Sequence, residues 1–500
     1  MAIIQGFLYV LQPLHFMFLF LGVAGGIIVG AIPGLTASVG IILLLPLVYQ
    51  LDASTAIVML CGMFCGAMYG GSISAILLSI PGTPSAAATV LDGYPLSQKG
   101  EAGKAIGVAT IASATGGIIS TFCLIFIAPQ LARFALKFGP EEYFALMIFG
   151  LTIIASVSGK SLVKGLIAGF FGLLVATVGL DPVTGYARFS FNIPNLMAGF
   201  PLLPVLIGLF AISQIFIQLE AVGEKIRHYK QKINKVLPSF KELKRLLPTI
   251  IASSFLGTFI GIIPGTGGTI ASFLAYNEAK RWSKDPDSFG KGNILGVAAP
   301  EAANNSTTGG AMVPLLSLGI PGDVVTAVML GALLLIGIKP GPFLFREHPE
   351  IVNSIFAGML LANVLILLLG ILSVRLFPQV LRTPDAILFP VILTLCFLGA
   401  FSLNNSVYDM SVALIFGVIG YIMRKNSFPI APVVLGVILG PIAEDELGRA
   451  LIIAHGDWTV LFQSPIAIFF YAISLLSLLY SLKMQFSTCC CSPKKGSWNY

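Results

Sequence analysis

The chain has 500 residues, of which 56% are hydrophobic and 10% are charged, with 29 Lys and Arg against 22 Asp and Glu. A typical soluble domain carries roughly 25% charged residues. This composition excludes a soluble globular enzyme, a disordered chain and a nucleic-acid-binding protein, because a soluble core cannot bury so much apolar surface. Most of the chain is therefore expected to lie in a lipid bilayer.

Long runs without a charged side chain recur along the sequence, for example at residues 1–51, 53–91, 105–132 and 246–277. A membrane-spanning helix needs about 20 apolar residues. The runs therefore predict an all-α polytopic membrane protein with about 10–14 membrane segments, some of them half-spans. They lack the alternation of an outer-membrane barrel. Leu14–Ile32 has no basic flank and no clear cleavage site, so we interpret it as a retained first helix.

An Ile-Pro-Gly triplet occurs twice in each half of the chain. Gly-Ala-Ile-Pro-Gly at 30–34 resembles Gly-Ile-Ile-Pro-Gly at 261–265. Leu-Leu-Ser-Ile-Pro-Gly-Thr at 77–83 resembles Leu-Leu-Ser-Leu-Gly-Ile-Pro-Gly-Asp at 315–323. The corresponding prolines are 231 and 240 residues apart. Four triplets at matched places indicate two pseudo-symmetric halves.

The strongest charge cluster lies between these halves, where eight basic residues stand against three acidic ones from Glu220 to Arg245. The positive-inside rule places this linker in the cytoplasm, and Lys483, Lys494 and Lys495 place the C-terminus there too. We expect a first transmembrane half at 1–219, a basic cytoplasmic linker at 220–246, a second half with additional helices at 247–483 and a polar tail at 484–500. In the tail, Cys489, Cys490 and Cys491 are open to lipidation or metal binding, but a solvated tail is the favoured interpretation.

The triplets predict broken or re-entrant membrane segments. Pro removes a backbone donor and Gly permits non-helical dihedral angles, so each triplet interrupts a helix. Such backbone is tolerated within a bilayer only where protein or a wet cavity surrounds it. Paired broken segments in two repeated halves are typical of the substrate site of a secondary transporter.

Helix N-termini at these breaks would present free N–H groups and a partial positive charge, which suits a carboxylate or a phosphate without a buried Arg. Small hydroxyl residues gather at the same places. The candidate substrate-binding residues are Pro33, Gly34, Thr36, Ser38, Gly82, Thr83, Gly265, Thr266, Asn304, Asn305, Ser306 and Gly322.

The second half adds a polar cluster at 300–310 with an acid, two amides and three hydroxyls. Oxygen ligands of this kind suit a hard cation such as Na⁺, and a carboxyl group there could instead carry a proton. We take Glu301, Thr307 and Asp323 as candidates for binding the coupling cation, either Na⁺ or H⁺. The competing interpretations are a loop acid for Glu301 and a helix N-cap for Asp323.

On these motifs, the sequence resembles the large membrane subunit of the tripartite tricarboxylate transporters, the TctA family. The matching stretches are Gly30–Pro46, Tyr69–Gly93 and Ile263–Gly341, and size and hydropathy match from about residue 12 to 483. The resemblance implies a prokaryotic inner-membrane transporter of citrate-like or other organic carboxylates, coupled to Na⁺ or H⁺. It also implies two partners, a periplasmic substrate-binding protein and a small four-helix membrane subunit.

Other classes fit the residues less well. The nearest approach to a phosphate-binding loop, at 158–161, lacks the first Gly of that motif, and no dinucleotide fingerprint occurs, so no cofactor and no enzymatic activity are expected. An intramembrane aspartyl protease built on Asp323 and Asp409 lacks the sequence motifs of that class. A passive anion channel stays open as an alternative, although repeated halves favour alternating access.

Overall fold

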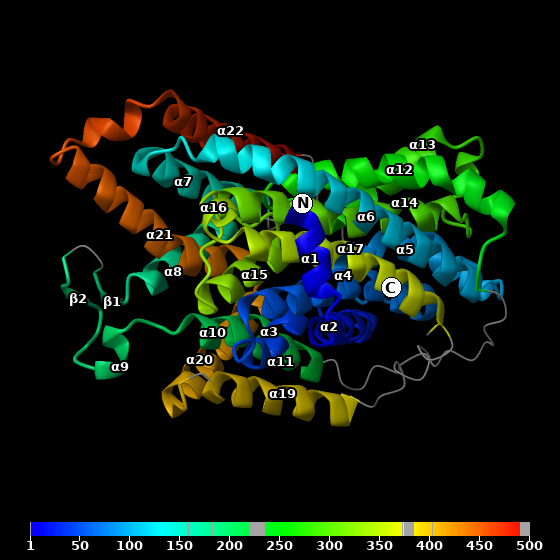
Figure 1. The fold of residues 1–500 in the computed structure, drawn as a ribbon, viewed down its shortest axis with the longest axis horizontal. Helices are drawn as coiled ribbons and strands as arrows, with labels where there is room; N and C mark the ends of the chain where they lie inside the picture. Colours follow the sequence, from blue (N-terminus) through cyan, green and yellow to red (C-terminus); the bar gives the residue numbers. More distant parts are fainter. Residues whose placement is uncertain are drawn as a thin grey trace. The chain divides into compact units, whose positions relative to one another are not determined.

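The computed structural model describes residues 2–157, 161–181, 184–220, 236–372, 374, 385–402 and 404–490. Almost every element is a helix (Figure 1), and the expected all-α membrane fold is confirmed. Within the described ranges, eight helices are long and apolar enough to cross a membrane. The chain divides into two compact units. The core unit comprises Met1–Lys137 and Pro201–Ile422, and the second unit comprises Phe138–Phe200 and Met423–Tyr500.

The first part of the core unit is a series of helices interrupted at the first two triplets. Asp52 caps α4 by accepting the backbone N–H of Thr55 at 3.0 Å. After α2 the chain breaks at Pro33, with Gly34 at φ +87°, and after α4 it breaks at Ser79, which has φ +63°. The helices are α1 (Ala2–Val10), α2 (Pro13–Ala31), α3 (Ala37–Val48), α4 (Ala53–Leu78), α5 (Ala87–Gln98) and α6 (Ala102–Ala135), with a 3₁₀ turn η1 (Pro84–Ala86) before α5.

The second part repeats this pattern. α12 breaks at Pro264, with Gly265 at φ +85°, and α14 breaks at Gly319, with φ +72°. The left-handed residues therefore stand at corresponding places in both halves. The elements are α12 (Phe240–Ile262), α13 (Gly267–Trp282), η3 (Pro286–Ser288), α14 (Leu295–Leu318), α15 (Val324–Leu335), α16 (Leu344–Glu347) and α17 (Pro349–Leu372). The core unit also contains α10 (Leu202–Leu206), a π-helical segment (Ile207–Ile212), α11 (Ser213–Glu220), α19 (Asp385–Ser402) and most of α20 (Val407–Lys425).

Glycines fix the packing of α2 on α4 and of α12 on α14, because they let the backbones approach closely. A Cβ at Gly26 would lie 2.5 Å from the Met63 carbonyl oxygen, and one at Gly257 would lie 2.3 Å from that of Ala303. Gly26 and Gly257 are 231 residues apart and Met63 and Ala303 are 240 apart, which are the spacings of the prolines. The two halves are thus equivalent in three dimensions as well as in sequence.

Contacts between the helices set their relative directions. α4 and α14 are antiparallel, because Met68 contacts Asn304 and Cys65 contacts Thr308. α6 and α17 are also antiparallel, because Gly117 approaches Asn363 and Thr110 approaches Gly370. Since α4 is equivalent to α14 and α6 to α17, the repeat is inverted, with its pseudo-two-fold axis near the crossing of α4 and α14. Inverted repeats of this kind are the usual basis of alternating access.

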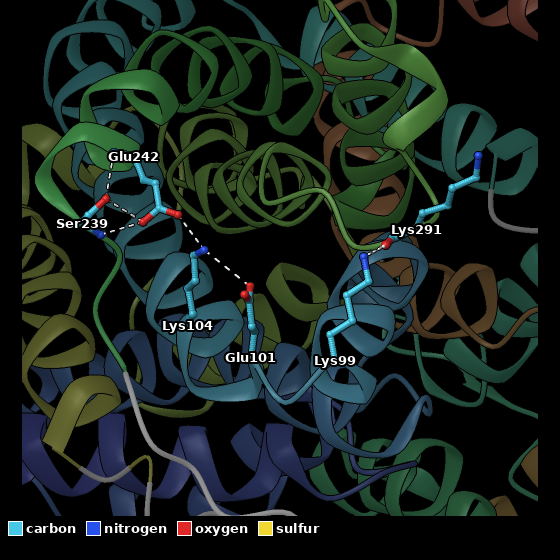
Figure 2. A network of polar contacts seen from close by, with 6 residues as sticks. All are labelled: Lys99, Glu101, Lys104, Ser239, Glu242 and Lys291. Atoms are coloured by element: carbon cyan, nitrogen blue, oxygen red, sulfur yellow. Dashed lines mark hydrogen bonds and ion pairs between the residues drawn. The ribbon is translucent and has the colours of Figure 1, made fainter.

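The N-termini of α6 and α12 lie together at one end of the core unit (Figure 2). Lys104 forms an ion pair with Glu242 at 2.6 Å, and Ser239 caps α12 with Glu242 in a capping box. Lys99 donates to the carbonyl oxygen of Lys291 at 2.6 Å. The basic linker therefore enters α12 at the end where α6 begins. Residues 221–235 of this linker lie outside the described residues, so its cytoplasmic location and the boundaries at 219 and 246 stay predictions.

The second unit is built from helices and a short antiparallel ribbon, β1 (Gly179–Leu180) with β2 (Ala187–Arg188). Arg188 donates to both oxygens of Glu444, and this hydrogen-bonded carboxylate raises the pKa of the guanidinium. The remaining elements are α7 (Pro140–Val157), α8 (Leu162–Ala176), α9 (Pro194–Met197), α21 (Ala431–Ile453), η4 (Trp458–Phe462) and α22 (Pro465–Cys490). Cys489 and Cys490 end α22, whereas Cys491 lies outside the described residues.

Candidate functional site

The breaks after α4 and α14 turn the chain back alongside the helix it has just left. Gly82 donates its N–H to the carbonyl oxygen of Gly71 at 3.2 Å, and a Cβ at Gly82 would lie 2.0 Å from the Gly30 carbonyl oxygen. A Cβ at Gly322 would likewise lie 2.6 Å from the Cα of Ala311. Only glycine fits at either place. The starts of α5 and α15 are therefore held beside the middle of α4 and α14.

The N-terminus of α13 points into the same region. A Cβ at Gly268 would lie 2.8 Å from Oδ1 of Asn304, 2.9 Å from Cε of Met68 and 3.0 Å from Cβ of Ser85. The third break is linked to the fourth, because Gly265 donates its N–H to the Gly322 carbonyl oxygen at 2.7 Å. The first N–H groups of a helix have no partner within it. The start of α13 thus brings free donors next to Asn304 and Ser85.

Asn304 connects the two halves at this point. Its Nδ2 donates to the Met68 carbonyl oxygen at 3.1 Å and its side chain is fully buried. Its Oδ1 accepts no hydrogen bond from any residue that the structure describes. The hydroxyls of Thr83 and Ser85 lie 3.1 Å apart and are also buried. A buried unpartnered carbonyl oxygen costs about 1–3 kcal/mol unless a ligand or water supplies a donor. We name the region formed by Thr83, Ser85, Gly268 and Asn304 the polar centre.

Glu301 lies one turn before Asn304 on α14 and is completely buried. Its carboxylate accepts hydrogen bonds from Thr89 Oγ1 at 2.5 Å and from Ser113 Oγ at 3.0 Å. Asn305 donates from Nδ2 to Ser113 Oγ at 2.8 Å, and among the described residues its buried Oδ1 has no partner. In the described part of the chain, no Lys, Arg or His pairs with Glu301. Within the described ranges, this carboxylate is therefore held by two hydroxyl groups.

Several other candidate residues use their polar atoms locally. Thr266 donates to the carbonyl oxygens of Ile260 and Ile263 and so closes the end of α12. The hydroxyl groups of Ser306 and Thr307 donate to backbone carbonyl oxygens one turn earlier, and these two residues lie against Gly257 and Gly261 of α12. A role for these three residues in binding stays a prediction.

Asp323 is the N-cap of α15, as the competing interpretation of the sequence expected. Its Oδ1 accepts the N–H and the hydroxyl of Thr326, each within 2.8 Å, and completes a capping box. The carboxylate lies near Gly267, where a Cβ would be 3.9 Å from the Cβ of Asp323. The N-cap role is a sufficient structural reason for an Asp at position 323. Cation binding by Asp323 stays a prediction.

The first break faces α11. The Pro33 carbonyl oxygen accepts a hydrogen bond from Nε2 of Gln218 at 3.2 Å, and a Cβ at Gly34 would overlap that amide. Thr36 begins α3 without a side-chain cap, and Ser38 is buried in its first turn. A role for Pro33, Gly34, Thr36 and Ser38 in substrate binding stays a prediction.

Four residues at these sites were missed by the sequence reasoning: Thr89, Ser113, Gln218 and Asp92. Thr89 and Ser113 sit in apolar runs, where a lone hydroxyl carries little signal, although Thr110, Ser113 and Ser120 follow a helical spacing along one face of α6. Gln218 precedes the charge cluster, and nothing in its spacing points to Pro33. Asp92 is fully buried and accepts the N–H groups of Gly290, Gly292 and Asn293 and the hydroxyl of Tyr276.

The comparisons with known proteins agree with this architecture. Residues 16–435 match the family described as "Tripartite tricarboxylate transporter TctA family". The chain is 37% identical over 477 residues, 95% of each chain, to an Agrobacterium vitis protein described as "Uncharacterized 52.8 kDa protein in TAR-I ttuC' 3'region". It is 38% identical over 226 residues to a second protein of that organism, "Uncharacterized protein in TAR-II ttuC' 3'region", covering 45% of this chain and 93% of that one. No solved structure matches.

The resemblance seen in the Ile-Pro-Gly motifs is thereby confirmed over most of the chain. A family match of this extent, together with a relative at 37% identity over 95% of both chains, fixes the family and with it a role in transport. This chain belongs to the TctA family of the tripartite tricarboxylate transporters.

Proposed function

We propose that this chain imports tricarboxylates or related organic carboxylates by secondary transport through the polar centre, coupled to Na⁺ or H⁺. It would act in the inner membrane of a prokaryote with a periplasmic substrate-binding protein and a small four-helix membrane subunit. Family membership supports these two partners. The inverted repeat supports alternating access over a passive pore, because two halves related by a two-fold rotation can exchange conformations and so open the site to either side of the membrane in turn.

The observation that carries the proposal is the unpartnered Oδ1 of Asn304 facing the N-terminus of α13. The free N–H groups of that helix suit the carboxylate oxygens of a substrate. The amide oxygen needs a donor, which a carboxylate cannot supply but a hydroxyl group can. The polar centre therefore suits an organic acid that carries both carboxylate and hydroxyl groups, such as citrate.

Gly268 offers a sharp test, because the start of α13 needs a residue without a side chain there. The chain would be reconstituted in vesicles with its two presumed partners, and uptake of labelled citrate and other carboxylates would be measured. The variant Gly268→Ala should lose most uptake, since its Cβ would occupy the space between Asn304 and Ser85. Gly169→Ala is the matched control, because the nearest atom to its Cβ is 3.8 Å away, on Pro432.

Saturable uptake that Gly268→Ala abolishes and Gly169→Ala preserves would support a site in the polar centre. Equal uptake by both variants would contradict that location. If the intact assembly transports none of the carboxylates tried, the proposed substrate class is wrong, and a binding screen on the periplasmic partner would identify another.

A further inference from the structure

Among the residues that the structure describes, Glu301 has no cationic partner to balance its charge. Its side chain is completely buried on α14, its oxygens accept only the hydroxyls of Thr89 and Ser113, and within the described residues no cation balances it. Removing an ionised carboxylate from water without a counter-charge is strongly unfavourable. A carboxyl group in such surroundings must gain either a proton or a cation for part of its working cycle.

The inverted repeat shows that the fold itself does not need an acid here. The 240-residue spacing that relates α4 to α14 equates Glu301 with Cys61, which is 1% exposed and uncharged. The same packing of a glycine-lined helix pair is built around both positions. Because the fold accommodates a small uncharged side chain at one of two equivalent places, the acid at the other requires a reason beyond packing.

The two groups that contact the Glu301 carboxylate are hydroxyls that donate to it, an arrangement that suits exchange of a proton. Thr89 and Ser113 lie at 2.5 and 3.0 Å and direct hydroxyl groups at the two carboxylate oxygens, and the Asn305 amide nitrogen donates to Ser113. A Na⁺ ion would need several oxygen lone pairs directed at one point. Hydroxyl groups can stabilise the carboxylate as donors and, by rotating, accept from the protonated acid.

We propose that Glu301 is the carrier of the coupling proton, an inference that rests on the proposed transport function. One carboxylate oxygen takes up a proton from the side at which substrate enters, forming an O–H bond. The same bond breaks when the proton leaves to the other side, and no electrons are transferred. Asn304 and Asn305 follow Glu301 on α14, so the proton site adjoins the polar centre. One movement of the halves can therefore expose both sites to the same side of the membrane.

Few other titratable groups face this position from the elements packed against it. α4 contributes Tyr69, whose hydroxyl is 2.8 Å from that of Thr110, and Cys65, which contacts Thr308. α5 contributes Asp92, which is held by the N–H groups after η3 and by Tyr276 of α13. α6 contributes Lys104, but it lies near Glu242 at the end of the helix (Figure 2). Asp92 thus accepts backbone N–H groups and a phenol, whereas Glu301 accepts two hydroxyl groups.

The test separates net transport from exchange. Glu301→Gln, which mimics the protonated acid, would be reconstituted with both partners. Uptake of labelled citrate would be driven first by an inward proton gradient and then by exchange against internal unlabelled citrate, which needs no net proton movement. In this variant, the rate of gradient-driven uptake should fall at least tenfold, and the rate of exchange should stay within about twofold of that of the unchanged chain. Relative to Glu301→Gln, Glu301→Asp should restore part of the gradient-driven uptake. Glu350→Gln, at an exposed position, serves as the control.

Three results would overturn the proposal: undiminished proton-driven uptake in Glu301→Gln, loss of exchange in a variant whose thermal unfolding matches that of the unchanged chain, or accumulation by the unchanged chain under a Na⁺ gradient but not a proton gradient. Failure of the unchanged chain to transport any carboxylate would instead refute the transport function on which the inference rests. The two failures are therefore distinguishable within one set of vesicles.

Discussion

The side-chain nitrogen of Asn304 lies 3.1 Å from the carbonyl oxygen of Met68, and this hydrogen bond joins the two inverted halves at their crossing point. One side of the amide thereby ties α14 to α4, and the other side presents a bare oxygen to the start of α13. A movement of one half against the other would pivot close to the atoms proposed to hold the substrate.

Replacing Asn304 should weaken substrate binding more than it weakens the fold. Asn304→Ala removes the free oxygen, and loss of a hydrogen bond in a buried site costs about 1–3 kcal/mol, so KM for citrate should rise about 5- to 150-fold. Asn304→Asp should raise KM further, because its negative charge would repel the carboxylates of the substrate. Ser317→Ala, on the same helix with its hydroxyl bonded to the Val313 carbonyl oxygen, should leave KM unchanged. An unchanged KM in Asn304→Ala would remove this residue from the site.

Close packing of α2 on α4 should be sensitive to a single methyl group. A Cβ at Gly30 would lie 2.2 Å from the carbonyl oxygen of Ala67, whereas one at Gly25 would meet the flexible end of Met63 at 3.3 Å. Gly30→Ala should therefore destabilise the protein by about 1–3 kcal/mol, the usual cost of overpacking, and Gly25→Ala should cost much less. Thermal unfolding of the purified protein in detergent measures both, and equal melting temperatures would contradict the packing described.

Asp92 should act as an anchor for the loop between α13 and α14. Its carboxylate accepts three backbone N–H groups and the Tyr276 hydroxyl, at 2.7 to 3.0 Å. Asp92→Ala removes the acceptor of all four hydrogen bonds, whereas Tyr276→Phe removes a single hydrogen bond worth about 1 kcal/mol. A cysteine introduced at Ser288 should react with a water-soluble maleimide markedly faster in Asp92→Ala and only slightly faster in Tyr276→Phe. Identical rates in both backgrounds would show that the loop is held by other contacts.

The cap at Asp52 predicts a pH dependence of stability. Burial opposes ionisation of this carboxyl group, but hydrogen bonds from Thr55 and Tyr9 outweigh it and lower the pKa below its ordinary value. A lowered pKa in the folded state stabilises the fold above the unfolded pKa of about 4 and stops doing so as the pH falls through the folded value. Asp52→Ala should cost about 1 kcal/mol at pH 7, as for other N-caps, and the difference should shrink below about pH 4. Melting curves of both proteins from pH 7 to pH 3 test this, and a gap that is constant across the range would refute the ionised cap.

Much of the fold could be predicted because lipid imposes simple rules on sequence. Charge-free runs define membrane segments, and Ile-Pro-Gly breaks define where they are interrupted, so the paired Pro33 and Pro264 revealed the repeat. Its inverted sense could not be predicted, because it depends on which residues of α4 and α14 meet, and neither hydropathy nor spacing encodes the antiparallel contact of Met68 with Asn304.

The candidate site was predicted in part for a related reason. Asn304 and Glu301 stood out because polar groups are rare in apolar runs, and the structure places both in the buried centre. Thr89 and Ser113 did not stand out in the sequence. A Ser or Thr hydroxyl can form its hydrogen bond with a carbonyl oxygen of its own helix, so a single hydroxyl does not indicate a binding site. Ser306 and Thr307 were predicted as site residues but lie against α12. Neighbours in sequence lie on different faces of a helix, so a polar run along α14 does not all face one site.

The most direct test of transport by this chain is the steady-state ratio of internal to external labelled citrate in vesicles holding the chain and its two partners, under an imposed ion gradient. A coupled transporter with alternating access should raise this ratio well above one and lose the excess when an ionophore collapses the gradient. A ratio that never exceeds one, with uptake that does not saturate, would show a passive anion channel and contradict the account.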